Sequence, residues 1–598
     1  MFKDAAERLS VQALLNCYWR ETGLGEHRPR TALAPALQAL CPCADVLELR
    51  LQPLDQLIWV PLAYHSPTGR HRISGPIVTS KADGYQPLPS ELLASLLLCD
   101  LAERFKGGHL PADSGDILAL FLQSMATMRG FLAQRQADLA DLFAAHVNFY
   151  HAEQALLVGH QTHPAPKSRQ GFSAGESEHF SPEAAARCRL HWWLLAPGLI
   201  KQSASQGAKP TAMLREWLLA QTALSQRARD TLVQQERWEL LPLHAWQARH
   251  LLGRESIQKL IAAGQLLDLG EQGEPLWPTS SIRTLAAPNV PWMFKCSLSV
   301  AITNSVRINQ FRECLRGELG CLLWQSSLGD ELKQRFPTLR PVNDPAWLTL
   351  EVEGQVLDEA TCILRDNPFA ADAPVTCMAA LCQDHPQQPG NRFTELLSVL
   401  ATREGISSQQ AAERWLAGFI TVAVEPMLAL YLEYGMAFEA HQQNTLIELE
   451  NLWPARFWVR DNQGFYYIEE RAGRVLQQVP ELAGAAESVG PQAFVDERFH
   501  YYFFHNTLFG LINAMGHSGL VDERPLLRQL RTALEVIDAR YPHNSLLAPV
   551  LNAASLPYKG NLLTRLAGID ELVAPLTEQS VYVQLNNPLW EVRDGASA

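Results

Sequence analysis

Apolar and polar residues alternate along much of residues 46–80, which is the pattern of β-strands with one buried face. Pro67 and Gly69 lie between two strand-like runs in "YHSPTGRHRI" and predict a hairpin turn. Farther along the chain, helical and strand-like stretches follow one another without a regular strand–helix–strand rhythm. The pattern therefore predicts an α+β protein.

Helical periodicity begins at Pro89 and Ser90, residue types that favour helix starts, and residues 116–158 are helix-rich until Gly159 ends the pattern. The most apolar long run, residues 416–432, is interrupted by a glutamate and a proline. This run is shorter than a typical membrane-spanning helix. We expect a buried helix pair or one kinked core helix instead.

Two stretches, residues 168–183 and 382–392, are polar and rich in Gly, Pro or Ser. Such composition is typical of segments that cannot bury themselves, so both are interpreted as linkers or excursions. They suggest three parts, residues 1–165, 166–385 and 386–598. Internal repeats and low-complexity tracts are absent from the sequence.

The composition narrows the class of protein. With 598 residues and 47% hydrophobic content, the chain is long enough for several domains with ordinary cores. A formal net charge of −13, without a long Lys/Arg run, argues against non-specific nucleic-acid binding. The eleven cysteines lack CxxC spacings, and the N-terminus lacks the apolar core of a signal peptide. We therefore expect a cytoplasmic protein with reduced thiols and no nucleic-acid or membrane partner.

The first candidate for chemistry is "GHQTHPAPKSRQGF". His160 and His163 have a spacing that could hold zinc, but Pro164 breaks any helix there and no third ligand is near. Lys167 and Arg169 flank one serine, so in an extended backbone both cations point to the same side. This arrangement suits an anion.

Glycine-rich nucleotide fingerprints, GxxxxGK[ST] and GxGxxG, are missing. Polar and basic residues instead interrupt apolar, strand-like sequence: Ser281 and Arg283 in "PTSSIRTL", then Lys295, Thr303 and Arg307 in "MFKCSLSVAITNSVRIN". Strand alternation places the last three in phase on one face. That face could line a pocket for phosphates or carboxylates, and a solvated sheet face is the other interpretation.

A third group lies in "GMAFEAHQQNTLI", which carries Glu439, His441 and Asn444. After it, Asp461 ends a strand and Gly464 turns the chain, which predicts a hairpin. A histidine and an asparagine three apart, followed by an acidic residue at a strand end, are similar to the catalytic and metal-binding elements of kinases, although the spacing differs. Capping of the local backbone by the His and Asn is the alternative.

Arg498 in "ERFHYYFFHN" and Lys559 in "LPYKGNLLTRL" lie among apolar residues, where a cation usually has an anionic partner. Together with "WELLPLHAWQ" and "FWVRDNQG", the motifs from the basic loop to "YKGNLLTRL" resemble the NRPS-independent siderophore synthetases, the family of the aerobactin and achromobactin enzymes. The resemblance runs from about residue 145 to the C-terminus. The stretches "EQALLVGHQTHPAPKS" and "SVYVQLNNPLW" are similar to the citrate-using type.

The resemblance implies an ATP- and Mg²⁺-dependent ligase of siderophore biosynthesis. Such an enzyme adenylates a carboxylate of citrate, releases pyrophosphate, and passes the acyl group to an amine or hydroxyl acceptor, such as an amino acid, a diamine or a hydroxylated lysine derivative. It also implies a cupped-hand α+β fold, with an N-terminal thumb (1–165), fingers carrying the ATP-binding strands (166–385) and a kinase-like palm (386–598). We expect a homodimer.

Roles follow from the matching motifs. The residues implied in ATP binding are His163, Lys167, Arg169, Ser281, Arg283, Lys295 and Asn444. Those implied in metal binding are Glu439, Asn444 and Asp461. The carboxylate substrate is expected to contact Thr303, Arg307, His441, Arg498, Tyr501 and Lys559. Arg307 and His441 would be catalytic, with a protonated His441 as one way to add positive charge.

Other functions stay open at this point. The same chemistry could act on a citrate monoamide or on α-ketoglutarate. A kinase-like phosphotransferase would use the same Glu, Asn and Asp but would form ADP. A non-catalytic citrate-binding protein would use the basic pocket without ATP.

Overall fold

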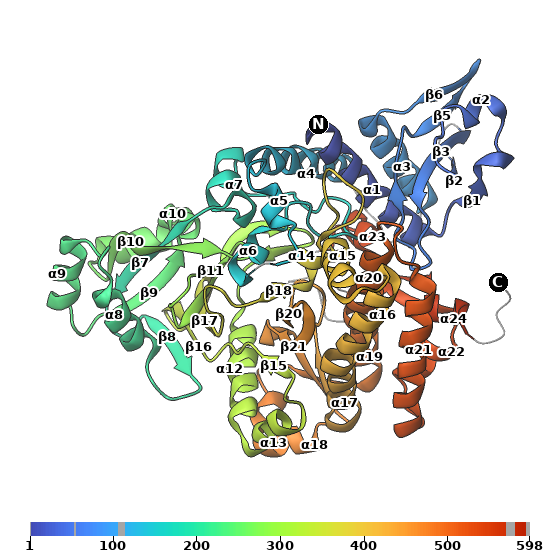
Figure 1. Cartoon of the computed structure of the whole chain (residues 1–598). Coiled ribbons are helices and arrows are strands. Elements are labelled where there is room, and N and C mark those ends of the chain that lie inside the picture. Colours follow the sequence, from blue (N-terminus) through green and yellow to red (C-terminus); the bar gives the residue numbers. More distant parts are fainter. Residues whose placement is uncertain (1, 53–54, 106–113, 147, 570–579, 594–598) are drawn as a thin grey trace.

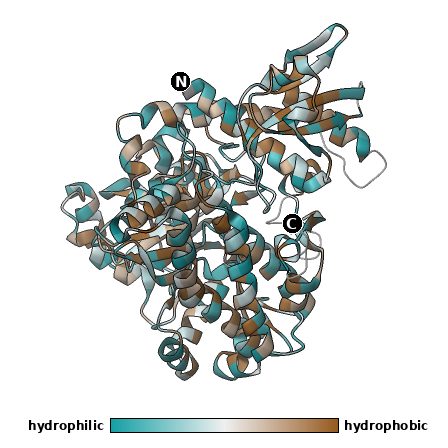
Figure 2. Ribbon diagram, turned by 45° about the vertical axis from the view of Figure 1, so that its right-hand side comes forward, coloured by the Kyte–Doolittle hydropathy of each residue, from teal (hydrophilic) through white to brown (hydrophobic). Residues whose placement is uncertain are grey.

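The computed structural model describes the whole chain except residues 1, 53–54, 106–113, 147, 570–579 and 594–598. The described part is a mixed α+β fold, in which largely antiparallel sheets are covered by helices (Figure 1). Hydrophobic and hydrophilic segments alternate along the helices (Figure 2), as expected where one side of each helix is buried.

The N-terminal sheet lies at one end of the molecule, in blue in Figure 1. Its strands are β1 (Glu26–Pro29), β2 (Asp45–Leu51), β3 (Gln56–Tyr64), β4 (Arg72–Ile73), β5 (Val78–Lys81) and β6 (Gly84–Pro87). Strand β3 pairs antiparallel with β4, with Leu62 opposite Ile73, which confirms the predicted hairpin. Gly69 in its turn has φ +79°, a conformation that glycine adopts without steric cost.

Helices close the core of this N-terminal sheet, and one of them comes from the other end of the chain. They are α1 (Phe2–Thr22), α3 (Ser90–Arg104), α4 (Ser114–Gln134) and the C-terminal α23 (Asn561–Leu566). Helix α3 begins where the sequence predicted, after Pro89. Leu562, Leu563 and Leu566 of α23 are buried in the same apolar cluster as α1. The carboxylate of Glu21 in α1 accepts the N–H groups of Leu562 and Leu563 at 2.9 and 2.7 Å.

The largest sheet has eight strands in the order β8-β16-β17-β12-β11-β10-β7-β9, all in antiparallel pairs. Their bounds are β7 (Cys188–Leu195), β8 (Ile200–Ala204), β9 (Glu239–His244), β10 (Leu266–Pro278), β11 (Thr284–Ala286), β12 (Trp292–Cys296), β16 (Ala346–Val352) and β17 (Gln355–Asp366). The buried Trp192 and Trp193 of β7 lie in its core, so the strand is apolar on both faces.

The remaining strands are short, and they form a hairpin and three small sheets. They are β13 (Leu298–Ile302), β14 (Ser305–Arg307), β15 (Leu339–Pro341), β18 (Val375–Cys377), β19 (Met436–Phe438), β20 (Thr445–Glu450), β21 (Trp453–Val459), β22 (Phe465–Ile468), β23 (Val489–Gly490), β24 (Ser555–Lys559) and β25 (Tyr582–Asn586). Strands β13 and β14 pair with each other, outside the eight-stranded sheet.

Helix α2 (Pro35–Gln38) packs on the N-terminal sheet, where Leu37 is buried with Val46 and Trp59. The other helices lie around the central sheet and the C-terminal strands. They are α5 (Leu139–Leu142), α6 (Phe149–Gln154), α7 (Ala174–Phe180), α8 (Pro210–Ala220), α9 (Gln226–Gln234), α10 (Ala245–Leu252), α11 (Glu255–Ala262), α12 (Phe311–Gln325), α13 (Ser327–Arg335), α14 (Met378–Cys382), α15 (Arg392–Glu404), α18 (Gly473–Gln478), α19 (Gln492–Phe499), α20 (Gly510–Gly516), α21 (Glu523–Arg540), α22 (Leu547–Asn552) and α24 (Pro588–Glu591).

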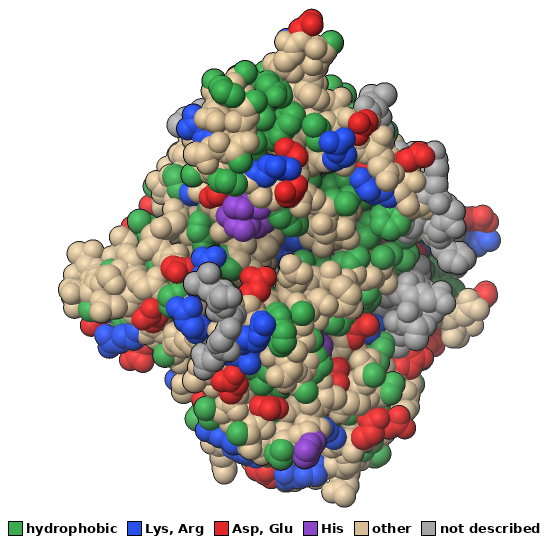
Figure 3. Space-filling view, turned by 90° about the vertical axis from the view of Figure 1, so that its right-hand side faces the viewer, with side chains coloured by type: hydrophobic (Ala, Val, Ile, Leu, Met, Phe, Trp, Pro, Cys, Tyr) green, Lys and Arg blue, Asp and Glu red, His purple; other side chains and the backbone are tan. Residues whose placement is uncertain are grey.

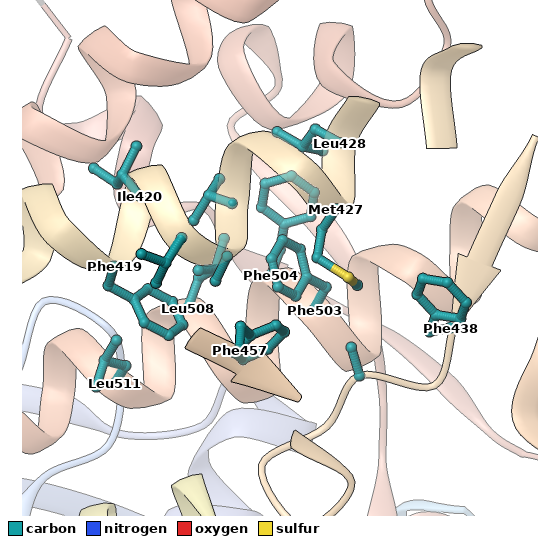
Figure 4. Close-up of a cluster of buried hydrophobic side chains, with 14 of the residues drawn as sticks. Phe419, Ile420, Met427, Leu428, Phe438, Phe457, Phe503, Phe504, Leu508 and Leu511 are labelled. Atoms are coloured by element: carbon teal, nitrogen blue, oxygen red, sulfur yellow. The ribbon is translucent and has the colours of Figure 1, made fainter. Parts of the chain in front are cut away.

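The long apolar run is one buried, irregular helix, consistent with the predicted core helix. Helix α16 (Ser408–Phe419) continues through a π-helical turn, residues 420–424, into α17 (Glu425–Tyr434). Among described residues it is the one helix long and apolar enough to cross a membrane, with a mean hydropathy of 1.7, but 72% of that stretch is buried inside the protein. Its side chains pack against the π-helical segment 500–509 and its neighbours (Figure 4). Pro426 lacks an N–H, and the Glu425 N–H bonds five residues back, to Ile420, which accommodates the proline.

Both predicted linkers are wrong. Residues 168–183 contain α7 and bury Phe180 in the core of the eight-stranded sheet. Residues 382–392 contain the buried Asp384, whose carboxylate lies 2.5 Å from an Arg70 guanidinium nitrogen. These polar residues are buried because they find partners far away in the sequence, which local composition does not reveal.

Candidate active site

A cavity of about 650 Å³ collects all fifteen residues that the sequence predicted for the site. It is lined by the basic loop, by the turn before β11 and the central strand β12 of the large sheet, by the β13–β14 hairpin and by segments of the C-terminal half. Among the described residues, thirteen Lys and Arg side chains and five Asp and Glu side chains line it. The surface is different, because basic and acidic side chains are interspersed on the face shown in Figure 3. Positive charge is thus concentrated inside this acidic protein.

The two cations of the basic loop point to the same side, as predicted, but toward a carboxylate of the protein. Glu183 Oε1 lies 2.5 Å from Lys167 Nζ and 3.0 Å from an Arg169 guanidinium nitrogen, and all three side chains are buried. Burial alone would raise the pKa of Glu183, but the two cations outweigh it and hold the pKa below its usual range. Burial lowers the pKa of Lys167 to about 8. One carboxylate shared by two cations leaves net positive charge at this wall of the cavity.

His163 is held as a neutral imidazole. Its Nδ1 accepts the N–H of Ala165 at 3.1 Å, so the proton lies on Nε2, which donates to Asn304 Oδ1 at 3.1 Å. Burial lowers the pKa of His163 to about 4. This histidine can therefore orient the loop without adding charge.

Ser281 and Arg283 lie in the turn that leads into β11. Ile282 between them has φ +67°, a strained conformation for a β-branched residue. The Arg283 guanidinium donates to Asn309 Oδ1 at 2.8 Å, and the Ser281 hydroxyl donates to Thr284 Oγ1 at 2.9 Å. These hydrogen bonds hold the strained turn in place. The turn in turn keeps the Ser281 and Arg283 side chains on the cavity wall.

Four charges form a network at that wall, three of them buried and one, Asp461, partly buried. Lys295 Nζ lies 2.5 Å from Asp461 Oδ1, and Arg365 Nε lies 2.6 Å from Asp344 Oδ1. Arg365 also donates to Asp461, so one arginine joins both carboxylates. Burial would raise the pKa of Asp461, but Arg365 and Lys295 hold it well below its usual range. Two cations and two anions balance one another here.

The predicted continuous strand through Lys295, Thr303 and Arg307 is wrong. Lys295 belongs to β12, whereas the other two belong to the separate β13–β14 hairpin. The chain leaves the sheet at Ser297, whose hydroxyl donates to the carbonyl of Asp358 at 2.6 Å. Thr303 has φ +58° in the hairpin turn. Its hydroxyl and the carbonyl of Ile302 each accept from the Arg307 guanidinium at 2.8 Å, so the turn orients the arginine.

The Glu439–Asn444 segment follows β19 and also lines the cavity. His441 Nδ1 accepts the Gln443 N–H at 3.3 Å, and Asn444 Nδ2 donates to the carbonyl of Glu439 at 3.2 Å. Burial lowers the pKa of His441 to about 3, which favours the neutral imidazole over a protonated His441. Burial raises the pKa of Glu439, whose carboxylate accepts the Tyr466 hydroxyl at 2.9 Å. A neutral imidazole with its proton on Nε2 can donate a hydrogen bond to an anion.

Asp461 does not lie in the predicted hairpin. Strand β21 pairs with β20, and β22 pairs with β19 in a different sheet. Asp461 sits between them with φ +67°. The backbone therefore redirects the chain at this residue and aims its carboxylate at Lys295.

Arg498, Tyr501 and Lys559 approach from the C-terminal helices and β24. The Arg498 guanidinium lies 3.5 Å from the centre of the Phe494 ring, and Lys559 Nζ lies 5.6 Å from the centre of the Tyr501 ring. Asn561 donates to the Tyr501 hydroxyl at 3.2 Å. Aromatic rings thus help to hold both cations at the cavity.

Comparisons with known proteins agree with this geometry. The model of the IucA / IucC family matches residues 148–383, and one described as ferric iron reductase FhuF-like transporter matches residues 413–574. The chain is similar to the rhizobactin siderophore biosynthesis protein RhbC of Rhizobium meliloti (strain 1021), with 37% identity over 89% of this chain and 90% of that protein. It is 33% identical to the spermidine-citrate ligase of Bacillus anthracis over 98% of both chains.

The chain belongs to the IucA/IucC family. The solved structure of ATP-bound aerobactin synthetase IucA from a hypervirulent pathotype of Klebsiella pneumoniae matches with a TM-score of 0.86 and 29% identity, over 97% of this chain and 99% of that one. The structure of the petrobactin biosynthesis protein AsbB from Bacillus anthracis shares the fold, with a TM-score of 0.73 and 16% identity over 99% and 96% of the two chains. The protein is therefore a ligase of siderophore biosynthesis.

The donor groups present fit Mg²⁺ better than a transition metal. In this IucA/IucC protein, the described part of the chain holds no group of three or more His, Cys, Asp or Glu side chains arranged for a metal. It does offer the carboxylates of Glu439 and Asp461 and the amide of Asn444 in one cavity. Few protein oxygens, with water and substrate phosphates as further ligands, are typical of magnesium.

Three important residues were missed in the sequence: Glu183, Asp344 and Arg365. Arg365 ends the apolar run "CILRD" of β17, and the rule that buried cations need an anionic partner would have marked it. That rule does not name the partner. Glu183 lay in a segment interpreted as a linker, so no signal pointed to it.

Proposed function

We propose that this protein joins citrate to an amine or hydroxyl acceptor in two steps. A citrate carboxylate oxygen attacks the α-phosphorus of ATP, the bond to the β-phosphate bridging oxygen breaks, and pyrophosphate leaves. The acceptor then attacks the acyl carbon, AMP leaves, and the attacking nitrogen or oxygen loses its proton. The observation that carries the proposal is the excess of buried cations in one cavity, because ATP and a tricarboxylate together bring several negative charges.

Binding of ATP is assigned to one wall of the cavity. The residues proposed are His163, Lys167, Arg169, Ser281, Arg283, Lys295 and Asn444. Glu439, Asn444 and Asp461 would hold Mg²⁺, which when bound neutralises phosphate charge. Support comes from their shared cavity and from the ATP-bound state of the similar IucA structure.

Citrate is assigned to the other wall. Arg307, Arg498 and Lys559 supply three positive charges for three carboxylates, and Thr303 and Tyr501 supply hydroxyl groups. Arg307, held by the strained turn, would stabilise the charge that develops as the carboxylate attacks phosphorus. His441 would donate from Nε2 as a neutral group. A monocarboxylate would make fewer contacts with these groups than citrate, which disfavours it.

The test measures pyrophosphate and hydroxamate. The protein is incubated with ATP, Mg²⁺ and hydroxylamine, together with citrate, succinate, acetate, α-ketoglutarate or a citrate monoamide. We expect citrate to give the highest rate of both products. Equal or faster turnover of α-ketoglutarate or of the monoamide would change the substrate. Formation of ADP would instead support a phosphotransferase, and no turnover would support a binding protein.

The proposal extends to the domain division and the oligomeric state of the protein. We propose a thumb (1–165), fingers (166–385) and a kinase-like palm (386–598), with a homodimer in the cytoplasm. Analytical ultracentrifugation tests the dimer, and a monomer at micromolar concentration would contradict it.

A further inference from the structure

An amine acceptor meets an electrostatic obstacle in this cavity. Most aliphatic amines are ammonium ions at neutral pH, and the described lining carries thirteen cations against five carboxylates. Like charges in a partly desolvated site repel, so an ammonium group needs a carboxylate that is not already neutralised. The charges of the lining carboxylates therefore decide where an ammonium group can bind.

Four of the five lining carboxylates already have a charged or hydrogen-bonding partner in the protein, and they are Glu183, Glu313, Glu439 and Asp461. The fifth is Glu497, and its side-chain carboxylate has no hydrogen bond within the described part of the chain. Arg498 pairs with it only at a distance of 4.0 Å, the outer limit of an ion pair, and that guanidinium also stacks on Phe494. With its side chain 40% exposed, Glu497 is at the entrance of the cavity.

Glu497 is also close to the proposed citrate wall. It lies in α19, one helical turn before Tyr501, and residues four apart on a helix have Cβ atoms about 5–6 Å apart. Both side chains line the same cavity, and Lys559 lies beyond the Tyr501 ring. An acceptor held at Glu497 therefore needs only a few methylene groups to bring a second nitrogen to an acyl group bound beside Tyr501.

We propose that Glu497 binds the ammonium group of the acceptor that does not react, and so selects diamines and polyamines. This inference rests on the proposed function, because it concerns the acceptor of that acyl transfer. An acceptor with a single amine loses this contact. An acceptor with a free carboxylate at the same position is repelled by Glu497.

The experiment compares acceptors of matched length. Wild-type protein is first shown to form citryl hydroxamate from citrate, ATP and hydroxylamine, and failure here refutes the proposed function itself. Next, kcat/KM is measured with 1,4-diaminobutane and spermidine against butylamine. We expect the diamines to be preferred by about tenfold or more, the low end for a hydrogen bond to a charged group because the site is half-exposed. Equal use of butylamine overturns the inference.

Variants then assign the preference to this carboxylate. Glu497→Gln should remove most of the diamine preference, Glu497→Asp should keep part of it, and Glu497→Lys should reverse it. The matched control is Glu487→Gln, because Glu487 is exposed, pairs with Arg312 and does not line the cavity. It should keep the wild-type ratio. Persistence of the preference in both Glu497→Gln and Glu497→Lys would overturn the inference.

The salt dependence of KM tests the inference on wild-type protein, without any variant. Added salt weakens attraction between an exposed carboxylate and an ammonium ion. For wild-type protein we expect the KM for the diamine to rise with salt more steeply than the KM for butylamine. Equal slopes for the two amines would overturn the inference.

Discussion

Replacing Asp461 or Asp344 with asparagine tests whether Asp461 binds the metal or, like Asp344, only balances buried positive charge. Both carboxylates belong to the network with Lys295 and Arg365, with contacts of 2.5 Å from Asp461 to Lys295 and 2.6 Å from Asp344 to Arg365. Of the two carboxylates, only that of Asp461 lines the cavity. Either substitution removes one negative charge and leaves one buried cation without a full partner. The two variants are therefore matched in charge and differ in access to a ligand.

The cost can be estimated from these contacts. At an effective dielectric constant of about 20, unit charges at this separation attract by about 6 kcal/mol. Asparagine carries no charge, so the variant avoids the cost of several kcal/mol for desolvating a carboxylate. The free energy of unfolding should therefore fall by a net amount of about 3–5 kcal/mol for each substitution. Asp461 is 20% exposed and Asp344 is 1% exposed, so the loss for Asp344→Asn should be equal to or larger than that for Asp461→Asn. Urea unfolding followed by tryptophan fluorescence measures them.

Binding of ATP then gives the decisive difference. Calorimetric titrations at a series of Mg²⁺ concentrations should show that Asp344→Asn keeps the Mg²⁺ dependence of wild-type protein. For Asp461→Asn we expect the affinity for Mg²⁺ to fall roughly a hundredfold, the upper range for lost metal-site groups. Unchanged Mg²⁺ dependence in Asp461→Asn, or equal loss in both variants, would refute the assignment of Asp461 as a ligand.

Three further predictions address the cavity walls. Arg307→Ala should lower citrate-dependent pyrophosphate release about a hundredfold with little change in thermal stability, and an unfolded variant would mark the arginine as structural. His441 should stay neutral in NMR titrations down to pH 5, because burial lowers its pKa to about 3, and its uptake of protons only when unfolded should make stability fall as pH drops below about 6.5. Arg169→Ala should weaken ATP binding by about 1–3 kcal/mol in calorimetry, whereas unchanged affinity would leave the cation a purely structural partner of Glu183.

Local patterns in the sequence predicted single elements and the members of the site. The β3–β4 hairpin and the start of α3 follow from turn and capping residues, which act over a few positions. The fifteen predicted site residues line one cavity. They could be predicted together because several short motifs were matched as a set.

The sequence could not predict long-range pairing. Thr303 and Arg307 have the right alternation for one strand with Lys295, but the chain leaves the sheet at Ser297, where a side chain bonds to a distant carbonyl. Likewise, Glu183 pairs with both cations of the basic loop from a segment whose composition resembles a linker. Pairing between distant residues depends on the three-dimensional fold, and a single sequence carries no pattern for it.

The contact between α1 and α23 has a consequence for biosynthesis. Glu21 binds the N-terminal amides of a helix 541 residues later in the chain, and leucines of that helix complete the apolar cluster around α1. At about 5–20 residues per second, a ribosome needs roughly half a minute to two minutes to synthesise the intervening chain. During that time the part of the first helix that α23 covers in the folded protein lacks its final partner. We expect the nascent protein to depend on chaperones over this interval, and deletion of residues 561–566 to leave the N-terminal sheet prone to proteolysis.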